Sequence, residues 1–197
     1  MEEITVHGLV AGGEDFGESD RLVKLLTAEL GVITVRMRGV KKEKAKLKYA
    51  AMPFSLCEYV LMKRGGFYSL KTASPIESLF SVTYDPDKYV VGSIMLETAA
   101  AGAGITDSTD IFVRLLTALK ALIYSETDPF SLGLNFVFSL LISGGYAVPS
   151  ANEKDFYCPI EEQKSLPDKD VAKYRLKKYI GLFEKKFYTV IKSAALL

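Results

Sequence analysis

Histidine and cysteine are scarce in this chain of 197 residues. The sequence holds one histidine, His7, and two cysteines, Cys57 and Cys158, which form no CxxC pair. A structural zinc site usually needs four Cys or His ligands, so these three residues cannot build one. The low cysteine content also argues against a disulfide-rich secreted scaffold and favours a reducing, cytoplasmic setting.

Motifs of the common enzyme classes are missing as well. The sequence contains no GxxxxGK[ST], HExxH or GxSxG string. Gly102 and Gly104 follow a helical pattern and are better interpreted as a helix stop than as a dinucleotide fingerprint. His7 falls in a predicted strand, and the acidic residues within 14–20 match no calcium loop. We therefore predict a protein that is not an enzyme and needs no metal or cofactor.

Signals for membrane insertion are weak. The acidic start of the chain, Met1-Glu2-Glu3, lacks the apolar run of a signal peptide. Residues 129–152 carry no charge, but their apolar centre is shorter than the ~20 residues of a membrane span. Asn135, Ser139 and Gly144-Gly145 also interrupt it. We interpret this stretch as a buried bundle helix, with a membrane segment as the alternative, and expect no membrane association.

What is present is the composition of a folded protein, with 49% apolar and 25% charged residues. In the first 80 residues apolar side chains alternate, as in Ile33, Val35 and Met37, which indicates half-buried strands. Leu56–Lys63 and Phe67–Thr72 predict a hairpin across Arg64-Gly65-Gly66. Asp20–Leu30 remains ambiguous, since its leucines fit a helical stripe and its ends fit a strand.

Past Pro75 the apolar period changes to about 3.6 residues. Asp85-Pro86 and Asp128-Pro129 are helix start signals, and residues 111–122 predict another helix between them. A final apolar seam consists of Leu176, Ile180, Phe183, Phe187 and Val190. We therefore predict an α+β protein with two domains, a small all-β domain over residues 1–80 and an α-helical bundle over residues 81–197. A long exposed loop is expected around residues 148–167.

Charge is distributed unevenly, although the net charge is +1. Residues 1–83, 84–162 and 163–197 carry net charges of +2, −7 and +6. The densest run combines one acid, Glu43, with seven cations: Arg36, Arg38, Lys41, Lys42, Lys44, Lys46 and Lys48. Such a run favours a polyanion partner, and nearby aromatic side chains could stack on bases: Tyr49, Phe54, Tyr59, Phe67 and Tyr68. The alternative is a solvated loop with its aromatic neighbours in the core.

Several short strings form a further pattern: Gly8-Leu9-Val10, Asp15-Phe16-Gly17-Glu18-Ser19-Asp20-Arg21-Leu22-Val23, Leu26-Thr27, Gly31, Arg38-Gly39-Val40 and Pro53-Phe54-Ser55. Farther on, Gly145-Tyr146-Ala147 follows a hydrophobic helix, and Ile191-Lys192-Ser193 lies near the end of the chain. In order and spacing, these strings resemble the RecO family of DNA repair and recombination mediators.

The resemblance implies an OB-fold barrel of five strands followed by a helical domain, and it makes Asp20–Leu30 a barrel strand. It also implies a bacterial, cytoplasmic, nucleoid-associated protein that binds single- and double-stranded DNA and anneals complementary strands. The implied partners are RecR and single-strand-binding protein. Arg38, Lys41 and Lys42 match the family's basic positions. Many members carry a four-cysteine zinc module after the glycine-tyrosine motif, where this chain has only Cys158.

A second hypothesis is a protein-interaction adaptor that has lost DNA binding. Its candidate partner-binding residues are cations of the C-terminal segment, namely Lys173, Lys177, Lys185 and Lys186. A basic rim over the apolar seam would suit an acidic peptide that ends in hydrophobic residues, such as the tail of single-strand-binding protein. The alternative for these lysines is a solvated helix surface.

Overall fold

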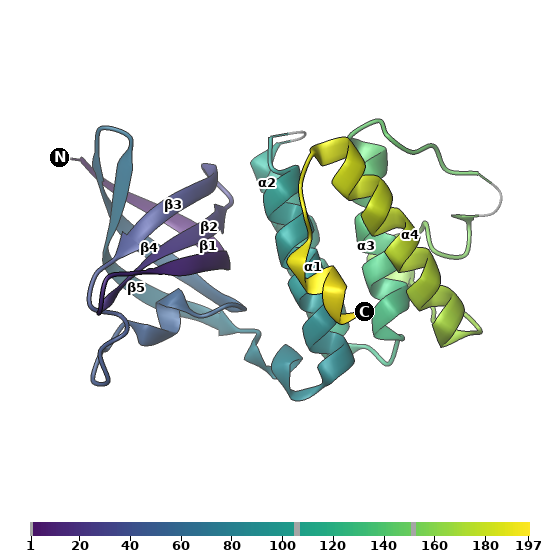
Figure 1. Cartoon of the computed structure of the whole chain (residues 1–197), viewed down its shortest axis with the longest axis horizontal. Helices are drawn as coiled ribbons and strands as arrows, with labels where there is room; N and C mark the ends of the chain where they lie inside the picture. Colours follow the sequence, from purple (N-terminus) through teal and green to yellow (C-terminus); the bar gives the residue numbers. More distant parts are fainter. Residues whose placement is uncertain (1, 105–106, 151–152) are drawn as a thin grey trace. The chain divides into compact units, whose positions relative to one another are not determined.

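The computed structural model describes residues 2–104, 107–150 and 153–197. These residues divide into two compact units, Met1–Phe80 and Ser81–Leu197. The first unit contains the strands and the second contains the long helices (Figure 1). Each unit is described by itself below.

The first unit is a closed barrel of five strands: β1 (Glu2–Phe16), β2 (Asp20–Thr27), β3 (Gly31–Met37), β4 (Ser55–Arg64) and β5 (Phe67–Ser78). The strands are ordered β1-β2-β3-β5-β4, and β4 pairs with β1 to close the barrel. Every pair is antiparallel except β3 with β5. This arrangement fits an OB-fold, and the predicted fold class is confirmed.

Strand β1 is long enough to pair with β2 along one part of its length and with β4 along another. A register shift between Val10 and Gly12 marks a bulge, which bends the strand. Gly8 pairs on both sides, and a Cβ atom there would lie 2.9 Å from the Leu25 Cγ atom. Glycine is therefore needed at this position for close packing inside the barrel.

The barrel core follows the predicted alternation, because Ile33, Val35 and Met37 are all buried. Asp20–Thr27 forms a strand, as the resemblance implies, so the helical interpretation of this segment is wrong. Pairing along both edges of β2 decides the conformation, and local periodicity carries no information about that pairing. Tyr59 and Phe54 are also buried, which makes them core residues and excludes them as stacking platforms.

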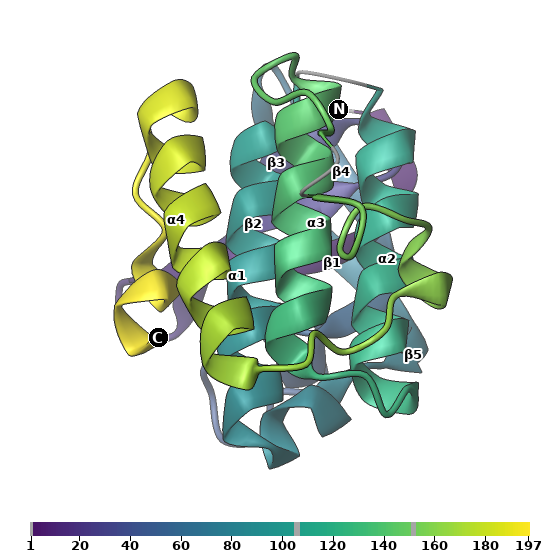
Figure 2. The same cartoon turned by 90° about the vertical axis from the view of Figure 1, so that its right-hand side faces the viewer.

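The second unit contains four α-helices: α1 (Pro86–Gly102), α2 (Ser108–Tyr124), α3 (Pro129–Ser143) and α4 (Lys169–Phe187). Helix α3 packs against α1, α2 and α4, as Figure 2 shows. Almost all of its side chains are therefore buried, which explains the uncharged stretch in the sequence. Among the described residues, no helix is both long enough and apolar enough to span a membrane.

The predicted helix starts are confirmed. The Asp85 carboxylate accepts a hydrogen bond from the Lys88 N–H group at 2.9 Å, and the Asp128 carboxylate accepts one from the Ser131 N–H group at 2.9 Å. The final apolar seam is only partly correct. Helix α4 ends at Phe187, so Val190 lies outside the helix and is 75% exposed.

The described residues also form short 3-10 helices: η1 (Lys48–Ala51), η2 (Phe80–Tyr84), η4 (Ile160–Glu162) and η5 (Lys192–Leu196). Helix η5 packs against α1, and the Ser193 N–H group donates to the Glu97 carboxylate. The expected loop at 148–167 includes residues 151–152, which lie outside the described residues. Its remainder was predicted to be exposed, but Phe156, Gln163 and Leu166 are buried.

Candidate nucleic-acid interface

Residues 38–48 connect β3 to η1, and we call this segment the lysine loop. Successive turns shape it, because the N–H groups of Lys42, Ala45 and Lys48 donate to the carbonyl groups three residues earlier at 3.2, 3.0 and 3.3 Å. Val40 is buried and Leu47 packs against the barrel core. The two apolar side chains thus anchor the loop at both ends.

Between and beside these anchors, basic side chains project into solvent. The exposed cations of the loop that form no ion pair with any described residue are Arg38, Lys42, Lys44, Lys46 and Lys48. The loop contains a single acid, Glu43. The exposed part of the loop therefore carries a strong positive charge that no described neighbour neutralises.

Arg36 and Lys41, also predicted as DNA-binding residues, are held differently. The Arg36 guanidinium donates to the Asp20 Oδ2 atom from Nε at 3.0 Å and from Nη2 at 2.8 Å. The same guanidinium lies 4.7 Å from the centre of the Phe16 ring. Lys41 Nζ donates to the Asp15 Oδ2 atom at 2.6 Å. These two cations tie the lysine loop and β3 to the turn between β1 and β2.

The groups that donate to Asp15 and Asp20, on either side of this turn, lower the pKa of both carboxylates. The Gly39 N–H group, which donates at 2.9 Å, and the Arg36 guanidinium lower the pKa of Asp20 below its usual value. The hydrogen bond from Lys41 lowers the pKa of Asp15 in the same way. Lys41 also donates its backbone N–H group to the Ser19 carbonyl at 3.0 Å. Asp15 and Asp20 therefore act as partners for the cations of β3 and of the lysine loop.

The strand register reveals two further cations of the barrel surface that the sequence analysis did not identify as candidates. Lys24 on β2 is paired with Thr34 on β3, and Arg64 on β4 is paired with Phe67 on β5. Both cations are exposed, and they lie outside the basic run. A sequence pattern could reveal them only if the pairing of β2, β3, β4 and β5 were already known, because the register decides which side chains share the outer face.

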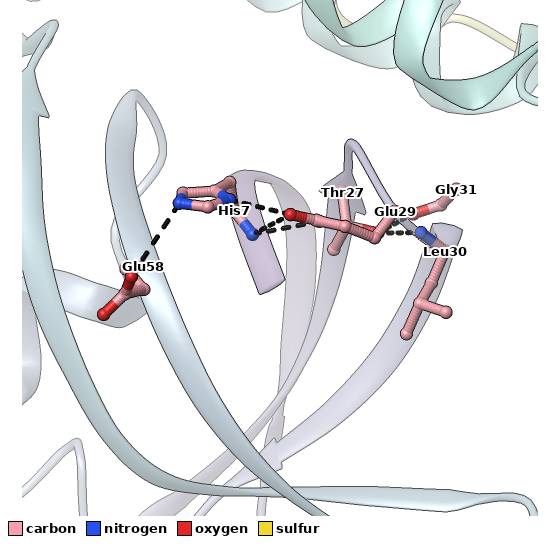
Figure 3. Close-up of polar contacts among 6 residues, drawn as sticks. All are labelled: His7, Thr27, Glu29, Leu30, Gly31 and Glu58. Carbon is pink, nitrogen blue, oxygen red and sulfur yellow. Dashed lines mark hydrogen bonds and ion pairs between the residues drawn. The ribbon is translucent and has the colours of Figure 1, made fainter. Parts of the chain in front are cut away.

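The only histidine is a structural residue of the outer barrel surface, as Figure 3 shows. His7 Nδ1 lies 2.7 Å from the Glu29 carboxylate, which also accepts the His7 N–H group at 3.0 Å. His7 Nε2 lies 3.8 Å from the Glu58 carboxylate. These contacts join β1 to β4 and to the turn between β2 and β3, where Thr27 accepts a hydrogen bond from the Leu30 N–H group.

The predicted partner-binding lysines of α4 do not form one cluster. Lys173 lies 5.4 Å from the centre of the Phe130 ring, and Lys186 lies 5.7 Å from the centre of the Tyr146 ring. Thirteen residues of helix separate these two lysines, which corresponds to about 20 Å along the axis. Lys177 lies one turn from Lys173, whereas Lys185 and Lys186 close the last turn of the helix.

Comparison with known proteins agrees with the barrel architecture. A family model described as the recombination protein O N-terminal domain matches residues 1–79. The DNA repair protein RecO of Caldicellulosiruptor saccharolyticus is 27% identical over 146 residues, which cover 74% of this chain and 60% of that protein. RecO of Bacillus subtilis is 33% identical over 123 residues, which cover 62% of this chain and 48% of that protein. The barrel of this chain is similar to the N-terminal domain of RecO proteins.

The match to RecO proteins is partial in length. RecO of Clostridium novyi, 28% identical over 139 residues, is covered to 54% of its length. The chain therefore spans 48–60% of the length of these RecO relatives. Within the chain, the family model matches the barrel that carries the lysine loop.

A RecO-type zinc module does not fit the residues of this chain. Cys158 Sγ lies 3.4 Å from the Gln163 side-chain oxygen, and Asn135 Nδ2 donates to that same oxygen at 2.9 Å. Among the described residues, no three His, Cys, Asp or Glu side chains are placed to share a metal ion. The Cys158 thiol is surrounded by amides, and burial raises its pKa, which disfavours the thiolate that zinc requires.

Proposed function

We propose that this protein is a non-enzymatic recombination mediator in DNA repair that binds single- and double-stranded DNA. The observation that carries the proposal is the set of exposed, unpaired cations of the lysine loop on an OB-fold barrel. OB-folds bind oligonucleotides with the face of β2 and β3 and with the β1–β2 and β4–β5 loops, and the lysine loop begins at the end of β3. The similarity of residues 1–79 to the RecO N-terminal domain supports the same assignment.

The proposed mechanism is electrostatic. Arg38 and the lysines 42, 44, 46 and 48 neutralise phosphates and release the counterions condensed on the nucleic acid. The same charges reduce the repulsion between two strands that approach each other, which would promote annealing. Arg36 and Lys41 contribute less to phosphate binding, because Asp20 and Asp15 already neutralise them. Their role is to hold the loop in position.

The first test is fluorescence anisotropy with labelled single- and double-stranded oligonucleotides over a series of salt concentrations. If five phosphates are engaged on a single strand, log K falls against log salt with a slope of about −3.5. A slope near zero, or no binding at low salt, would contradict the proposal. A strand-annealing assay with complementary oligonucleotides tests the mediator activity separately.

The second test assigns the site. Replacing Lys42, Lys44, Lys46 and Lys48 by Glu should abolish most of the DNA affinity, because four contacts become repulsive. The matched control reverses four lysines of α4, namely Lys173, Lys177, Lys185 and Lys186, and should retain DNA binding. Circular dichroism establishes that both variants are folded. Equal loss of binding in both would show that DNA affinity depends on total charge and not on this loop.

Cooperation with RecR and with the tail of single-strand-binding protein is a further part of the proposal. The C-terminal end of α4 offers a basic and apolar surface, because Lys185 and Lys186 are exposed and Tyr188 is 96% exposed. This surface also favours the adaptor as the second candidate function. A pull-down with the tail peptide in the absence of DNA distinguishes the two, because an adaptor would retain the peptide when the lysine loop is reversed in charge.

A further inference from the structure

An exposed carboxylate, Asp15, lies between two cations beside the lysine loop. Lys41 Nζ donates to its Oδ2 atom at 2.6 Å, and Arg21 Nε lies 3.6 Å from its Oδ1 atom. Arg21 pairs with Asp15 across β1 and β2, so the two side chains share one face of the hairpin. Arg21 Nε is buried and has no hydrogen-bond partner among the described residues. Two cations therefore face a single carboxylate.

The neighbouring carboxylate, Asp20, is held much more firmly. It accepts two hydrogen bonds from the Arg36 guanidinium and one from the Gly39 N–H group, and its side chain is 14% exposed. The Asp15 side chain is 61% exposed, and the Lys41 side chain that it binds is 30% exposed. An exposed ion pair contributes little to stability and is weakened further by salt. The pair that holds Lys41 can therefore open while the pair at Asp20 stays closed.

Opening this ion pair leaves the lysine loop in place. The Lys41 N–H group donates to the Ser19 carbonyl at 3.0 Å, and the Gly39 N–H group donates to the Asp20 carboxylate at 2.9 Å. Both contacts attach the loop to the β1–β2 turn through the loop backbone and not through the lysine ammonium. Exposed side chains change rotamer rapidly, so rotation of Asp15 and Lys41 is enough to free the Lys41 Nζ atom.

We infer that Lys41 and Arg21 form a phosphate site that Asp15 occupies in the free protein, so that Asp15 competes with a nucleic-acid phosphate for Lys41. A lysine ammonium donates to carboxylate and to phosphate oxygens alike, so one anion can replace the other. A strand held by the neighbouring lysines of the loop presents its phosphates to Lys41 at a high effective concentration. The competition lowers the affinity and lets a bound strand leave more readily. The inference rests on the proposed DNA-binding function and adds an internal control of its strength.

The test measures the affinity of the full chain for a labelled thymidine oligonucleotide at about 0.1 M salt. Asp15→Asn keeps the shape of the side chain, removes its charge and should bind about 5-fold more tightly. This gain corresponds to one phosphate contact with a salt slope of about −0.7, over a tenfold fall in salt from about 1 M. The matched control is Glu18→Gln, which removes the same charge from an exposed position of the same turn and should bind within about twofold of the parent protein.

A double-mutant cycle assigns the gain to Lys41. If Asp15 acts by occupying Lys41, Asp15→Asn should no longer strengthen binding once Lys41 is replaced by Gln. The step from Lys41→Gln to the double variant should therefore change the affinity by less than about twofold. An effect of Asp15 on the general charge or on the fold would give the same gain in both backgrounds. Circular dichroism establishes that every variant is folded.

A direct signal is available from NMR of the side-chain carboxyl carbons. The hydrogen bond from Lys41 is the main cause that lowers the pKa of Asp15. A bound thymidine oligonucleotide that takes over Lys41 should raise this pKa to at least its ordinary value of about 4. The internal control is Asp20, whose pKa should remain low because the Gly39 N–H group and the Arg36 guanidinium stay bound to it. An Asp15 pKa that stays low in the complex would contradict the inference.

The outcomes separate this competition from the proposed function. If Asp15→Asn binds like the parent while charge reversal in the lysine loop abolishes binding, the competition is wrong and DNA binding stands. Equal gains in Asp15→Asn and Glu18→Gln would also overturn the competition. If neither the parent protein nor Asp15→Asn binds DNA, the proposed function itself is wrong.

Discussion

Two irregular segments of this chain, the lysine loop and residues 153–167, are ordered by opposite means. The lysine loop is held by turns and by two apolar anchors, and its charged side chains remain in solvent. Residues 153–167, which we call the C-terminal loop, are held by buried side chains. Phe156 packs against Phe138 and Tyr179, with ring centres 5.2 and 5.9 Å away. One segment leaves its side chains free for a partner, and the other uses them for folding.

A network of amides completes the C-terminal loop. Asn135 on α3 donates to the Cys158 carbonyl and to the Gln163 side chain, both at 2.9 Å. Gln163 in turn donates to the carbonyl groups of Asp155 and Lys164 at 3.0 and 2.6 Å. These contacts cross-link the loop to the bundle. The comparison teaches that packed amides and an aromatic ring can order an irregular loop.

The largest effect on stability is expected from the aromatic ring of the C-terminal loop. Phe156→Ala removes a side chain that is 1% exposed, and it should lower the free energy of unfolding of the helical unit by about 3–5 kcal/mol. Denaturant unfolding followed by the helical circular dichroism signal measures the change. The control, Lys154→Ala, removes an exposed side chain of the same loop. Its free energy of unfolding should stay within about 0.5 kcal/mol of that of the parent protein. Similar values for both variants would show that the loop is not held by this ring.

The amide network should contribute less. Asn135→Ala leaves the Gln163 oxygen and the Cys158 carbonyl without their amide donor. It should lower the free energy of unfolding by about 1–3 kcal/mol. Ser139→Ala is the matched control, because the Ser139 hydroxyl only donates to the Phe136 carbonyl of its own helix. If the network stands in for a metal, a chelator should leave the unfolding midpoint of the parent protein unchanged. A chelator-dependent midpoint would contradict this account.

Local features of the fold could be predicted from the sequence, whereas contacts between residues far apart in the sequence could not. Helix starts and strand faces could be predicted directly, because they depend on residues close together in the sequence. Examples are the helix caps Asp85 and Asp128 and the alternating burial along β3. The pairing of Arg36 with Asp20 depends on the β2–β3 register, and the burial of Phe156 depends on contacts with α3 and α4. Neither follows from neighbouring residues. The resemblance to the RecO family supplied the strand assignment for residues 20–30, which periodicity left open.

An intermediate effect is expected where the lysine loop meets the β1–β2 turn. The folded protein lowers the pKa of Asp20, so this carboxylate stabilises the fold fully above its ordinary value near 4, and the contribution is lost as the pH falls through the lowered value. Asp20→Asn should therefore be less stable than the parent at neutral pH, and the difference should shrink in acid. Denaturant midpoints of the barrel unit measured from about pH 7 to about pH 2.5 test this.

The exposed Glu18→Gln, in the same turn, is the control for Asp20→Asn and should follow the parent at every pH. A constant difference between Asp20→Asn and the parent across the pH range would show that the ionised carboxylate is not the stabilising group.

The smallest effect on stability is expected from the lysine loop itself. Replacing Lys42, Lys44, Lys46 and Lys48 by Gln removes exposed charges that have no described partner, so the unfolding midpoint should shift by less than the equivalent of about 0.5 kcal/mol. The same variant should reduce the slope of log K against log salt by about 3 for a single strand, because four phosphate contacts disappear. A clear loss of stability with an unchanged slope would place these lysines in the folding of the barrel and remove them from the DNA interface.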